Sequence, residues 1–161
     1  MEFKKLRSGL RHQVYWITRR IALGSFATDA RGEYLLAQGI THILNVSDAP
    51  SVVAAEPGGF MCVRDCPVRD LERIPDDVAV RCLDEFHAML CDRGSKVYIH
   101  CTAGQNRSPC VLRLYFVACG LSPDDAAKLI TDRSPDAVPA HSRLVDEQLI
   151  AFVRRHGRDH F

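Results

Sequence analysis

The sequence predicts a single α/β domain, residues 1–161, in which a central mixed, mostly parallel sheet of four to five strands is covered by helices on both faces. Extended segments open the chain, strands and helices alternate through its middle, and helical segments end it. A chain of 161 residues with 47% hydrophobic residues is long enough for one core and short for two domains. No internal repeat or low-complexity linker divides it.

The first expected elements are a hairpin and a short helix. Val14–Ile17 and Ile21–Leu23 are apolar segments on either side of a short basic turn, a pattern typical of a hairpin. Apolar residues then recur at helical spacing from Asp29 to Gln38. Gly39 follows, where a helix commonly ends with a left-handed residue.

Two strands and two loops are expected next. Ile40–Val46 and Phe60–Cys66 have the apolar composition of strands. Ser47–Gly59 is rich in Pro, Gly, Ala and Ser, so it is expected to be a loop, with one short helix considered at Val52–Ala55. Pro67–Pro75 is a polar connection of the kind that often carries functional groups.

The middle of the chain predicts a helix followed by a short strand. The acidic pair Asp76 and Asp77 favours a helix N-terminus through the helix dipole. An amphipathic stripe continues from there to the neighbourhood of Gly94, where the helix is expected to end. Lys96–His100 then reads as a strand with an apolar interior.

Three helices are expected in the last third. Pro109 falls in the first turn of an apolar helix that ends before Gly120. Ser122 followed by proline and two acidic residues predicts a capped helix that continues to about Asp132. A last helix is marked by four apolar residues, Leu144, Leu149, Phe152 and Val153.

Charge and composition exclude several classes of function. Lys and Arg number 21 against 20 for Asp and Glu, so the net charge of +1 provides no general attraction for nucleic acid or an acidic membrane. No apolar run is long enough for a membrane span, and the basic start of the chain is not followed by a signal peptide's apolar stretch. We therefore expect a cytoplasmic protein with no nucleic-acid or membrane partner.

The cysteines and histidines do not predict a metal site. The chain has seven cysteines, an odd number that cannot pair completely. They lie mostly among apolar neighbours, which is typical of reduced thiols. Cys62 and Cys66 have no second Cys or His pair at zinc-finger spacing. His156 and His160 are expected to lie on a solvated helix end.

The nine residues from His100 to Ser108 carry the chemistry. They connect a predicted strand to the N-terminus of a predicted helix, so successive backbone N–H groups and the helix dipole point at one spot and can hold an anion. Gly104 allows the backbone to bend around that anion. A curled loop brings the thiol of Cys101 and the guanidinium of Arg107 onto the same ligand, as a nucleophile and a bidentate clamp.

This segment resembles the signature H-C-x5-R-[S/T] of the cysteine-dependent protein tyrosine phosphatase superfamily and matches it at every fixed position. Ile21–Ser25 and Gly39–Val46 are similar to the N-terminal half of the small, atypical dual-specificity phosphatases. The resemblance covers the chain from about Ile21 to Phe152.

The resemblance implies roles for the loop residues. Cys101 would attack phosphorus and become a phosphocysteine, Arg107 would bind the phosphoryl group, and Ser108 would stabilise the departing thiolate. His100 would hold the loop in shape. No cofactor or metal is implied. The phosphate would be bound by a run of loop residues, namely His100, Thr102, Ala103, Gly104, Gln105, Asn106 and Arg107.

The resemblance also implies an aspartic acid that protonates the leaving oxygen. Four aspartates lie in the relevant region. Asp65 is expected on a strand, and Asp76 and Asp77 read as helix N-terminal charges. Asp70 lies in the intervening loop at a position similar to that of the family's acid, so it is the expected general acid.

The implied substrate is a phosphorylated protein or peptide, with phosphotyrosine and phosphoserine or phosphothreonine both accepted. Neutral Thr102 and Gln105 stand where inositide-directed relatives carry lysine, and the pair Asn106 and Arg107 also occurs in RNA 5′-phosphatase relatives. A phosphoglucan, phospholipid or RNA 5′-phosphate substrate therefore remains an alternative, as does a phosphate-binding pseudophosphatase. The two long loops contain no aromatic residue, which predicts a shallow pocket.

Overall fold

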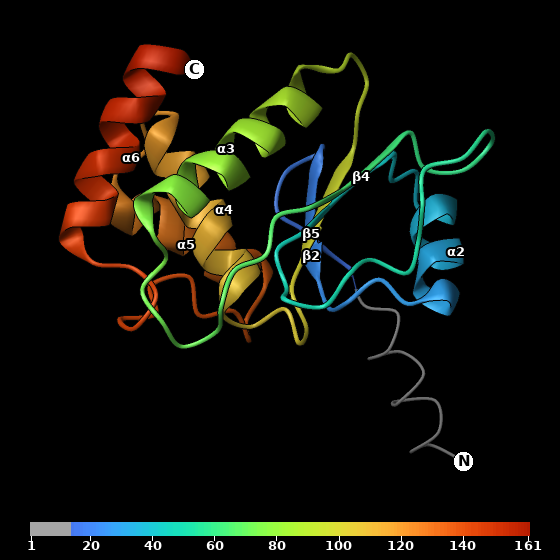
Figure 1. Cartoon of the computed structure of the whole chain (residues 1–161), viewed down its shortest axis with the longest axis horizontal. Helices are drawn as coiled ribbons and strands as arrows, with labels where there is room; N and C mark the ends of the chain where they lie inside the picture. The colour runs from blue at the N-terminus through green and yellow to red at the C-terminus, as the bar shows by residue number, and fades with distance from the viewer. Residues whose placement is uncertain (1–13) are drawn as a thin grey trace.

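The computed structural model describes residues 14–161, which contain five strands and five helices (Figure 1). The N-terminal residues considered for a signal peptide lie outside this described part. The strands are β1 (Tyr15–Trp16), β2 (Ile21–Gly24), β3 (His42–Asn45), β4 (Cys62–Asp65) and β5 (Val97–His100). The helices are α2 (Asp29–Ala37), α3 (Asp76–Cys91), α4 (Arg107–Ala118), α5 (Pro123–Arg133) and α6 (Glu147–His160).

The five strands form one sheet in the order β1-β2-β5-β3-β4. The predicted hairpin is confirmed, because β1 pairs antiparallel with β2 and places Tyr15 opposite Leu23. The other three pairs are parallel. The predicted mixed, mostly parallel sheet is therefore correct, and the carboxyl ends of the parallel strands lie along one edge, where open α/β sheets bind their ligands.

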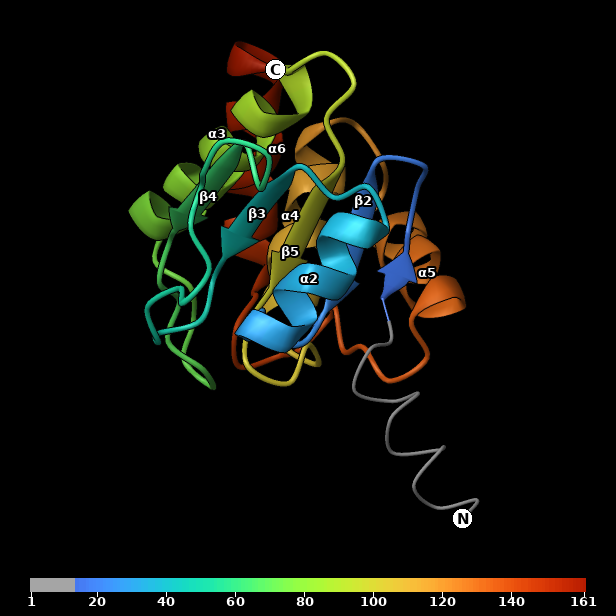
Figure 2. The ribbon, with the colours of Figure 1, turned by 90° about the vertical axis from the view of Figure 1, so that its right-hand side faces the viewer.

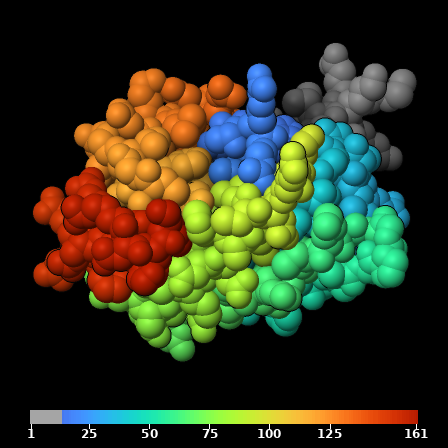
Figure 3. Space-filling model, turned by 90° about the horizontal axis from the view of Figure 1, so that it is seen from above, coloured from blue at the N-terminus to red at the C-terminus, as the bar shows by residue number. Residues whose placement is uncertain are grey.

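Helices cover both faces of the sheet (Figures 1 and 2). Alternate strand residues point to opposite faces, so Ile43 and Tyr98 pack with the layer of α2, whereas Leu44 and Ile99 join the larger core under α3 to α6. Every residue of α4 is buried, as its place in the centre of that larger layer requires. Seen from above (Figure 3), α5 and α6 form one end of the molecule and α2 lies near the other.

Local signals read from the sequence produce the expected helix ends. The side chain of Ser122 accepts a hydrogen bond of 3.1 Å from the Asp125 backbone N–H at the start of α5. Gly39 follows α2 with a left-handed φ of 86°. These ends depend on residues close in the chain, which is why they could be predicted.

Some element boundaries agree with the expectations and others differ. Ser47–Gly59 is a loop, as expected, and the short helix considered within it at Val52–Ala55 does not form, because Ala55 makes a bridge to Phe60. The strands are shorter than their apolar runs, with β3 confined to His42–Asn45. Pro109 lies in the first turn of α4, as predicted, because the helix begins at Arg107, whereas Leu144 precedes α6 instead of lying in it.

A close contact between helices fixes the position of α6. A side chain at Gly157 would overlap the backbone carbonyl of Ala118 at the end of α4. The glycine therefore allows the backbone of α6 to approach that of α4 closely.

None of the helices within residues 14–161 has the length and apolar composition needed to cross a bilayer.

Candidate active site

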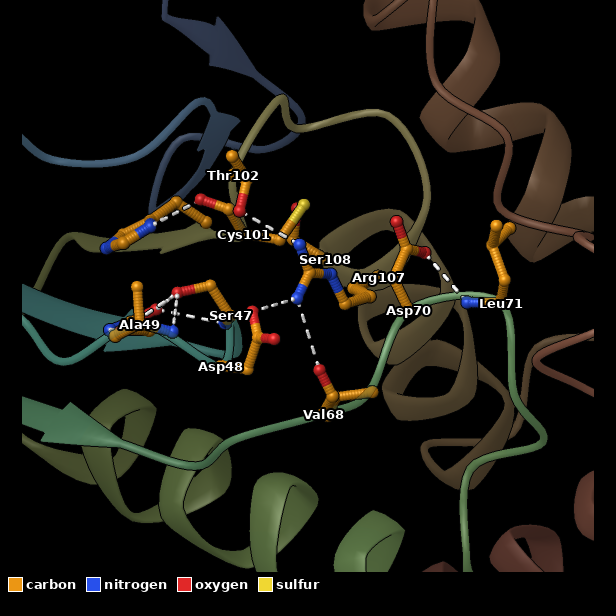
Figure 4. Close-up of polar contacts among 12 residues, drawn as sticks. Ser47, Asp48, Ala49, Val68, Asp70, Leu71, Cys101, Thr102, Arg107 and Ser108 are labelled. Atoms are coloured by element: carbon orange, nitrogen blue, oxygen red, sulfur yellow. Dashed lines mark hydrogen bonds and ion pairs between the residues drawn. The ribbon is translucent and has the colours of Figure 1, made fainter.

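The loop between β5 and α4 encloses a pocket at the carboxyl edge of the sheet (Figure 4). The pocket has a volume of about 280 Å³. The first backbone N–H groups of α4 have no side-chain cap, because Asn106 makes no capping hydrogen bond. Uncapped N–H groups at a helix N-terminus favour an anion. The residues that line the pocket are Asp70, Cys101, Thr102, Ala103, Gln105, Asn106 and Arg107.

Cys101 lies at the base of this pocket beside a hydroxyl donor. Its side chain is buried, and the fully buried Ser108 donates a hydrogen bond of 3.3 Å from Oγ to the Cys101 Sγ. A donor directed at sulfur and a nearby helix N-terminus both stabilise negative charge there. The arrangement therefore favours a nucleophilic sulfur.

Arg107 forms the cationic wall of the pocket. Its Nη1 donates to Asp48 Oδ1 at 2.9 Å and to the Val68 carbonyl at 3.3 Å, and its Nη2 donates to Thr102 Oγ1 at 2.9 Å. The Nε atom is buried and has no hydrogen-bond partner among the described residues. An unsatisfied buried donor costs about 1–3 kcal/mol, so an anionic oxygen in the pocket would remove that cost.

Sequence reasoning did not identify Asp48, which lies three residues after β3. Its carboxylate is exposed, and the hydrogen bond from Arg107 lowers its pKa below the ordinary value. The buried Asn45 holds this turn by donating from Nδ2 to the Ala49 carbonyl and accepting from the Ser47 N–H. An acidic residue just past a buried strand beside the signature strand is the signal that could have found it.

The bend of the loop depends on Gly104. Its φ is 78°, and a Cβ there would lie 2.6 Å from the carbonyl oxygen of Gly24. The Phe26 N–H donates to the Thr102 carbonyl at 2.9 Å and ties the same loop to the segment after β2. Gly104 thus serves the shape of the loop, and its neighbours line the pocket.

His100 lies behind the pocket and does not line it. Its side chain is fully buried, and burial lowers its pKa from 6.5 to about 4, so the ring is neutral near pH 7. Nδ1 lies 3.0 Å from the Cys101 carbonyl oxygen, so the neutral ring can donate from that nitrogen. This placement suits a residue that holds the loop and not one that touches the substrate.

The four candidate aspartates have separate surroundings. Asp65 lies on β4, where its carboxylate accepts hydrogen bonds from Ser51 and Asn45. Asp76 and Asp77 occupy the first turn of α3. Asp70 is exposed in the loop between β4 and α3 and alone among the four lines the pocket with Cys101.

The loop that carries Asp70 is anchored at both ends. The Val68 N–H donates to the Val46 carbonyl at 3.1 Å, and the Ile74 N–H donates to the Leu144 carbonyl at 2.9 Å. Both anchoring side chains are buried. The exposed residues between them are therefore held at the mouth of the pocket.

A comparison with protein families decides the class. The model of the Swiss Army Knife protein DSP-PTPase phosphatase domain matches residues 13–156. The chain belongs to this family. It is a cysteine-dependent phosphatase domain of the dual-specificity type, as the signature loop predicted.

Several known proteins resemble this phosphatase domain. The dual specificity protein phosphatase Mpk3 of Drosophila melanogaster is 30% identical over 134 residues, which are 81% of this chain and 31% of the relative. This chain thus spans about a third of that protein's length. The protein tyrosine phosphatase type IVA 2 of Mus musculus is 27% identical and is aligned over 79% of this chain and 77% of the relative.

The fold is also shared with solved phosphatase structures. The crystal structure of DUSP15 matches with a TM-score of 0.74 and 22% identity, and the match covers 93% of this chain and 97% of that one. The crystal structure of a mouse putative dual specificity phosphatase, complexed with zinc tungstate, has a TM-score of 0.70 and 22% identity over 92% and 88% of the two chains. The observed sheet order and helical layers are those of dual-specificity phosphatases.

The side chains weighed as metal ligands in this phosphatase domain lie apart from its pocket. His156 hydrogen-bonds to Asp84 through Nε2 at 2.7 Å, and its ring lies 4.5 Å from that of His160. Cys62 and Cys66 are free thiols. Cys62 is the first residue of β4, and Cys66 directly follows the last one. Within residues 14–161 no three His, Cys, Asp or Glu side chains are grouped to hold a metal ion.

The buried His100 predicts a pH dependence of stability. Its pKa of about 4 in the folded state lies below the ordinary 6.5, so the unfolded chain takes up this proton first as the pH falls. The free energy of unfolding should therefore fall between pH 6.5 and about 4, by up to about 3 kcal/mol from this group. Urea unfolding of the phosphatase domain at pH 6.5 and 4.5 measures the change.

A His100→Gln variant supplies the control for the other histidines, which titrate in the same range. Its stability should fall less over this pH interval than that of the unmodified protein. Equal slopes for the two proteins would show that His100 does not carry the effect.

Proposed function

We propose that this phosphatase domain hydrolyses phosphotyrosine, phosphoserine and phosphothreonine in proteins through a phosphocysteine on Cys101. The observation that carries the proposal is the buried, unpartnered Nε of Arg107, a residue that lines the same pocket as Cys101. A cationic donor without a protein partner, placed beside a nucleophile, is suited to bind a phosphoryl oxygen. A module that served only to bind phosphate would not need the nucleophile.

In the first chemical step the Cys101 thiolate attacks phosphorus. An S–P bond forms and the P–O bond to the substrate breaks, so the leaving oxygen needs a proton, which Asp70 supplies. The phosphoryl oxygens accept hydrogen bonds from the loop N–H groups and from Arg107. Charge that develops on these oxygens is therefore met by donors already in position.

In the second step water attacks the phosphocysteine. Asp70, now ionised, takes a proton from the water while the S–P bond breaks and inorganic phosphate is released. The electron pair returns to the sulfur of Cys101, where the Ser108 hydroxyl donates to it. The protein ends in its starting protonation state.

The shape of the pocket supports acceptance of several phosphorylated residues. None of the residues that line it within 14–161 is aromatic, and Asp70 at its edge is exposed. A deep aromatic slot would admit the long phosphotyrosine side chain alone. A shallow pocket also allows the shorter phosphoserine and phosphothreonine side chains to reach Cys101.

Two measurements test the proposal. Hydrolysis of an aryl phosphate without added metal is expected. Absence of turnover would instead favour a protein that only binds phosphate. Phosphotyrosine and phosphothreonine peptides with identical flanking residues should then both be hydrolysed. A kcat/KM ratio above about 10⁴ in favour of phosphotyrosine would contradict the shallow pocket, because one or two apolar contacts supply much less discrimination.

Asp70→Asn should lower the rate according to the leaving group. We expect a loss of about 10²–10⁴-fold for alkyl phosphates, whose basic oxygens need a proton, and a smaller loss for nitrophenyl phosphate.

Asp77→Asn is the matched control, because Asp77 is an exposed aspartate outside the pocket in the first turn of α3. It should change kcat/KM less than about twofold, in line with the small effects of surface substitutions. If Asp70→Asn caused an equal loss for all leaving groups, or no loss, the result would indicate that Asp65 or Asp76 is the general acid.

A further inference from the structure

Exposed apolar side chains lie next to the catalytic pocket. Within residues 14–161 four large hydrophobic side chains are exposed, and two of them, Leu71 and Val138, adjoin residues that line the pocket. Leu71 follows Asp70 directly. Val138 is joined to Gln105 by a backbone hydrogen bond of 2.7 Å. Neither residue belongs to a core cluster, so core packing does not explain these side chains.

The backbone of Leu71 is held in a costly conformation. Its φ is 57°, which is the one positive value at a non-glycine residue in the described part of the chain. Its N–H donates to Asp70 Oδ1 at 3.0 Å, so this turn and the Asp70 carboxylate are linked. Backbone strain of this kind is concentrated at ligand-binding positions, where the surrounding structure maintains it.

Leu71 shares one side of its loop with Asp70, which lines the pocket. Figure 4 shows the side chains of Asp70 and Leu71 on the same side of the loop that carries them. Burial of Val68 and Ile74 anchors this loop at both ends. The leucine is therefore held in a fixed position next to the pocket-lining Asp70.

Val138 is fixed against the signature loop by backbone hydrogen bonds. Its N–H donates to the Gln105 carbonyl, and its own carbonyl accepts from the Cys110 Sγ at 3.4 Å. Both backbone groups are thus engaged while the side chain is 42% exposed. The segment between α5 and α6 therefore presents a rigidly held aliphatic group beside Gln105.

The charged neighbours of Leu71 are paired with one another. Arg69 lies 3.9 Å from Glu72, and Arg73 contacts Asp76 and Asp146 at 2.9 and 2.8 Å. The opposite charges of each pair lie together, so these pairs give little reason to prefer an acidic or a basic substrate segment. The exposed aliphatic side chains are a further feature that can discriminate between sequences.

We propose that Leu71 and Val138 form an apolar rim of the pocket that binds an apolar residue next to the phosphorylated residue of a protein substrate. The proposal rests on the proposed function and specifies its substrate class. Burying part of one aliphatic side chain contributes a factor of about 3–10 to kcat/KM. The rim should therefore select among substrates without contributing to the chemical step.

Two phosphotyrosine peptides test the rim, one with leucine and one with serine on both sides of the phosphorylated residue. The unmodified protein should prefer the leucine peptide by about 5–10-fold in kcat/KM, mainly through a lower KM. Leu71→Asn introduces a polar residue that tolerates a positive φ, and Val138→Thr introduces a polar group in a side chain of similar shape. Each variant should reduce the preference, and the double variant should bring the ratio close to one.

Met61→Gln is the matched control, because Met61 is 70% exposed and does not line the pocket. It should keep the preference for the leucine peptide. Competitive inhibition by inorganic phosphate reports in every variant whether the signature loop is intact.

Equal hydrolysis of the two peptides by the unmodified protein would overturn the rim and leave the proposed function standing. An undiminished preference in the double variant would also overturn it. Failure to hydrolyse either peptide, with aryl phosphate still turned over, would overturn both the rim and the assignment of protein substrates.

Discussion

Replacing Cys101 with serine is expected to abolish hydrolysis of aryl phosphates, with a loss of at least about 10⁴-fold in kcat. A serine hydroxyl stays protonated where a cysteine sulfur can carry negative charge, so the variant lacks a nucleophile. The backbone N–H groups at the start of α4 and the guanidinium of Arg107 remain in place. Binding of inorganic phosphate, measured by isothermal titration calorimetry, should therefore persist while turnover is lost.

The reaction of the unmodified protein supplies a second readout of the same prediction. Acid quenching during turnover of a labelled substrate should trap phosphate on Cys101 and on no other cysteine. Cys119→Ser is the matched control, since Cys119 is an exposed thiol at the far end of α4, and it should keep full activity. Wild-type rates in Cys101→Ser would contradict the covalent mechanism.

Arg107→Lys is expected to reduce kcat/KM by about 10³-fold, close to the loss for the nucleophile. Asp48, Val68 and Thr102 accept three of the five guanidinium N–H bonds, which leaves Nε and the second N–H of Nη2 for the phosphoryl group. A lysine ammonium presents its donors from one point and cannot maintain these contacts while binding phosphate.

The binding measurement separates this variant from Cys101→Ser. Phosphate affinity should fall in Arg107→Lys, whereas it should persist in the serine variant. Arg154→Lys, an exposed position on α6, should leave both rate and affinity unchanged. Unaltered phosphate binding in Arg107→Lys would show that the anion is held by the backbone alone.

Much of the fold could be predicted because its signals are local. The cap at Ser122, the left-handed Gly39 and the apolar run of β5 each depend on residues adjacent in the chain. Ser47–Gly59 is a loop, as expected, but its conformation could not be predicted, because Ser51 in this loop is held by side chains of two strands. The Ser51 side chain makes hydrogen bonds with the side chains of Asn45 and Asp65, and no local sequence pattern predicts such contacts.

The sequence by itself determined the family and the signature loop, because Cys101, Arg107 and Ser108 are close in the chain and lie between a strand and a helix. Tertiary structure decided which distant groups meet them. The ion pair of Arg107 with Asp48, the place of Asp70 at the pocket and the position of Val138 beside Gln105 all join segments far apart in sequence. Such contacts depend on strand order and on how each loop is anchored, and both are properties of the assembled sheet and its helices.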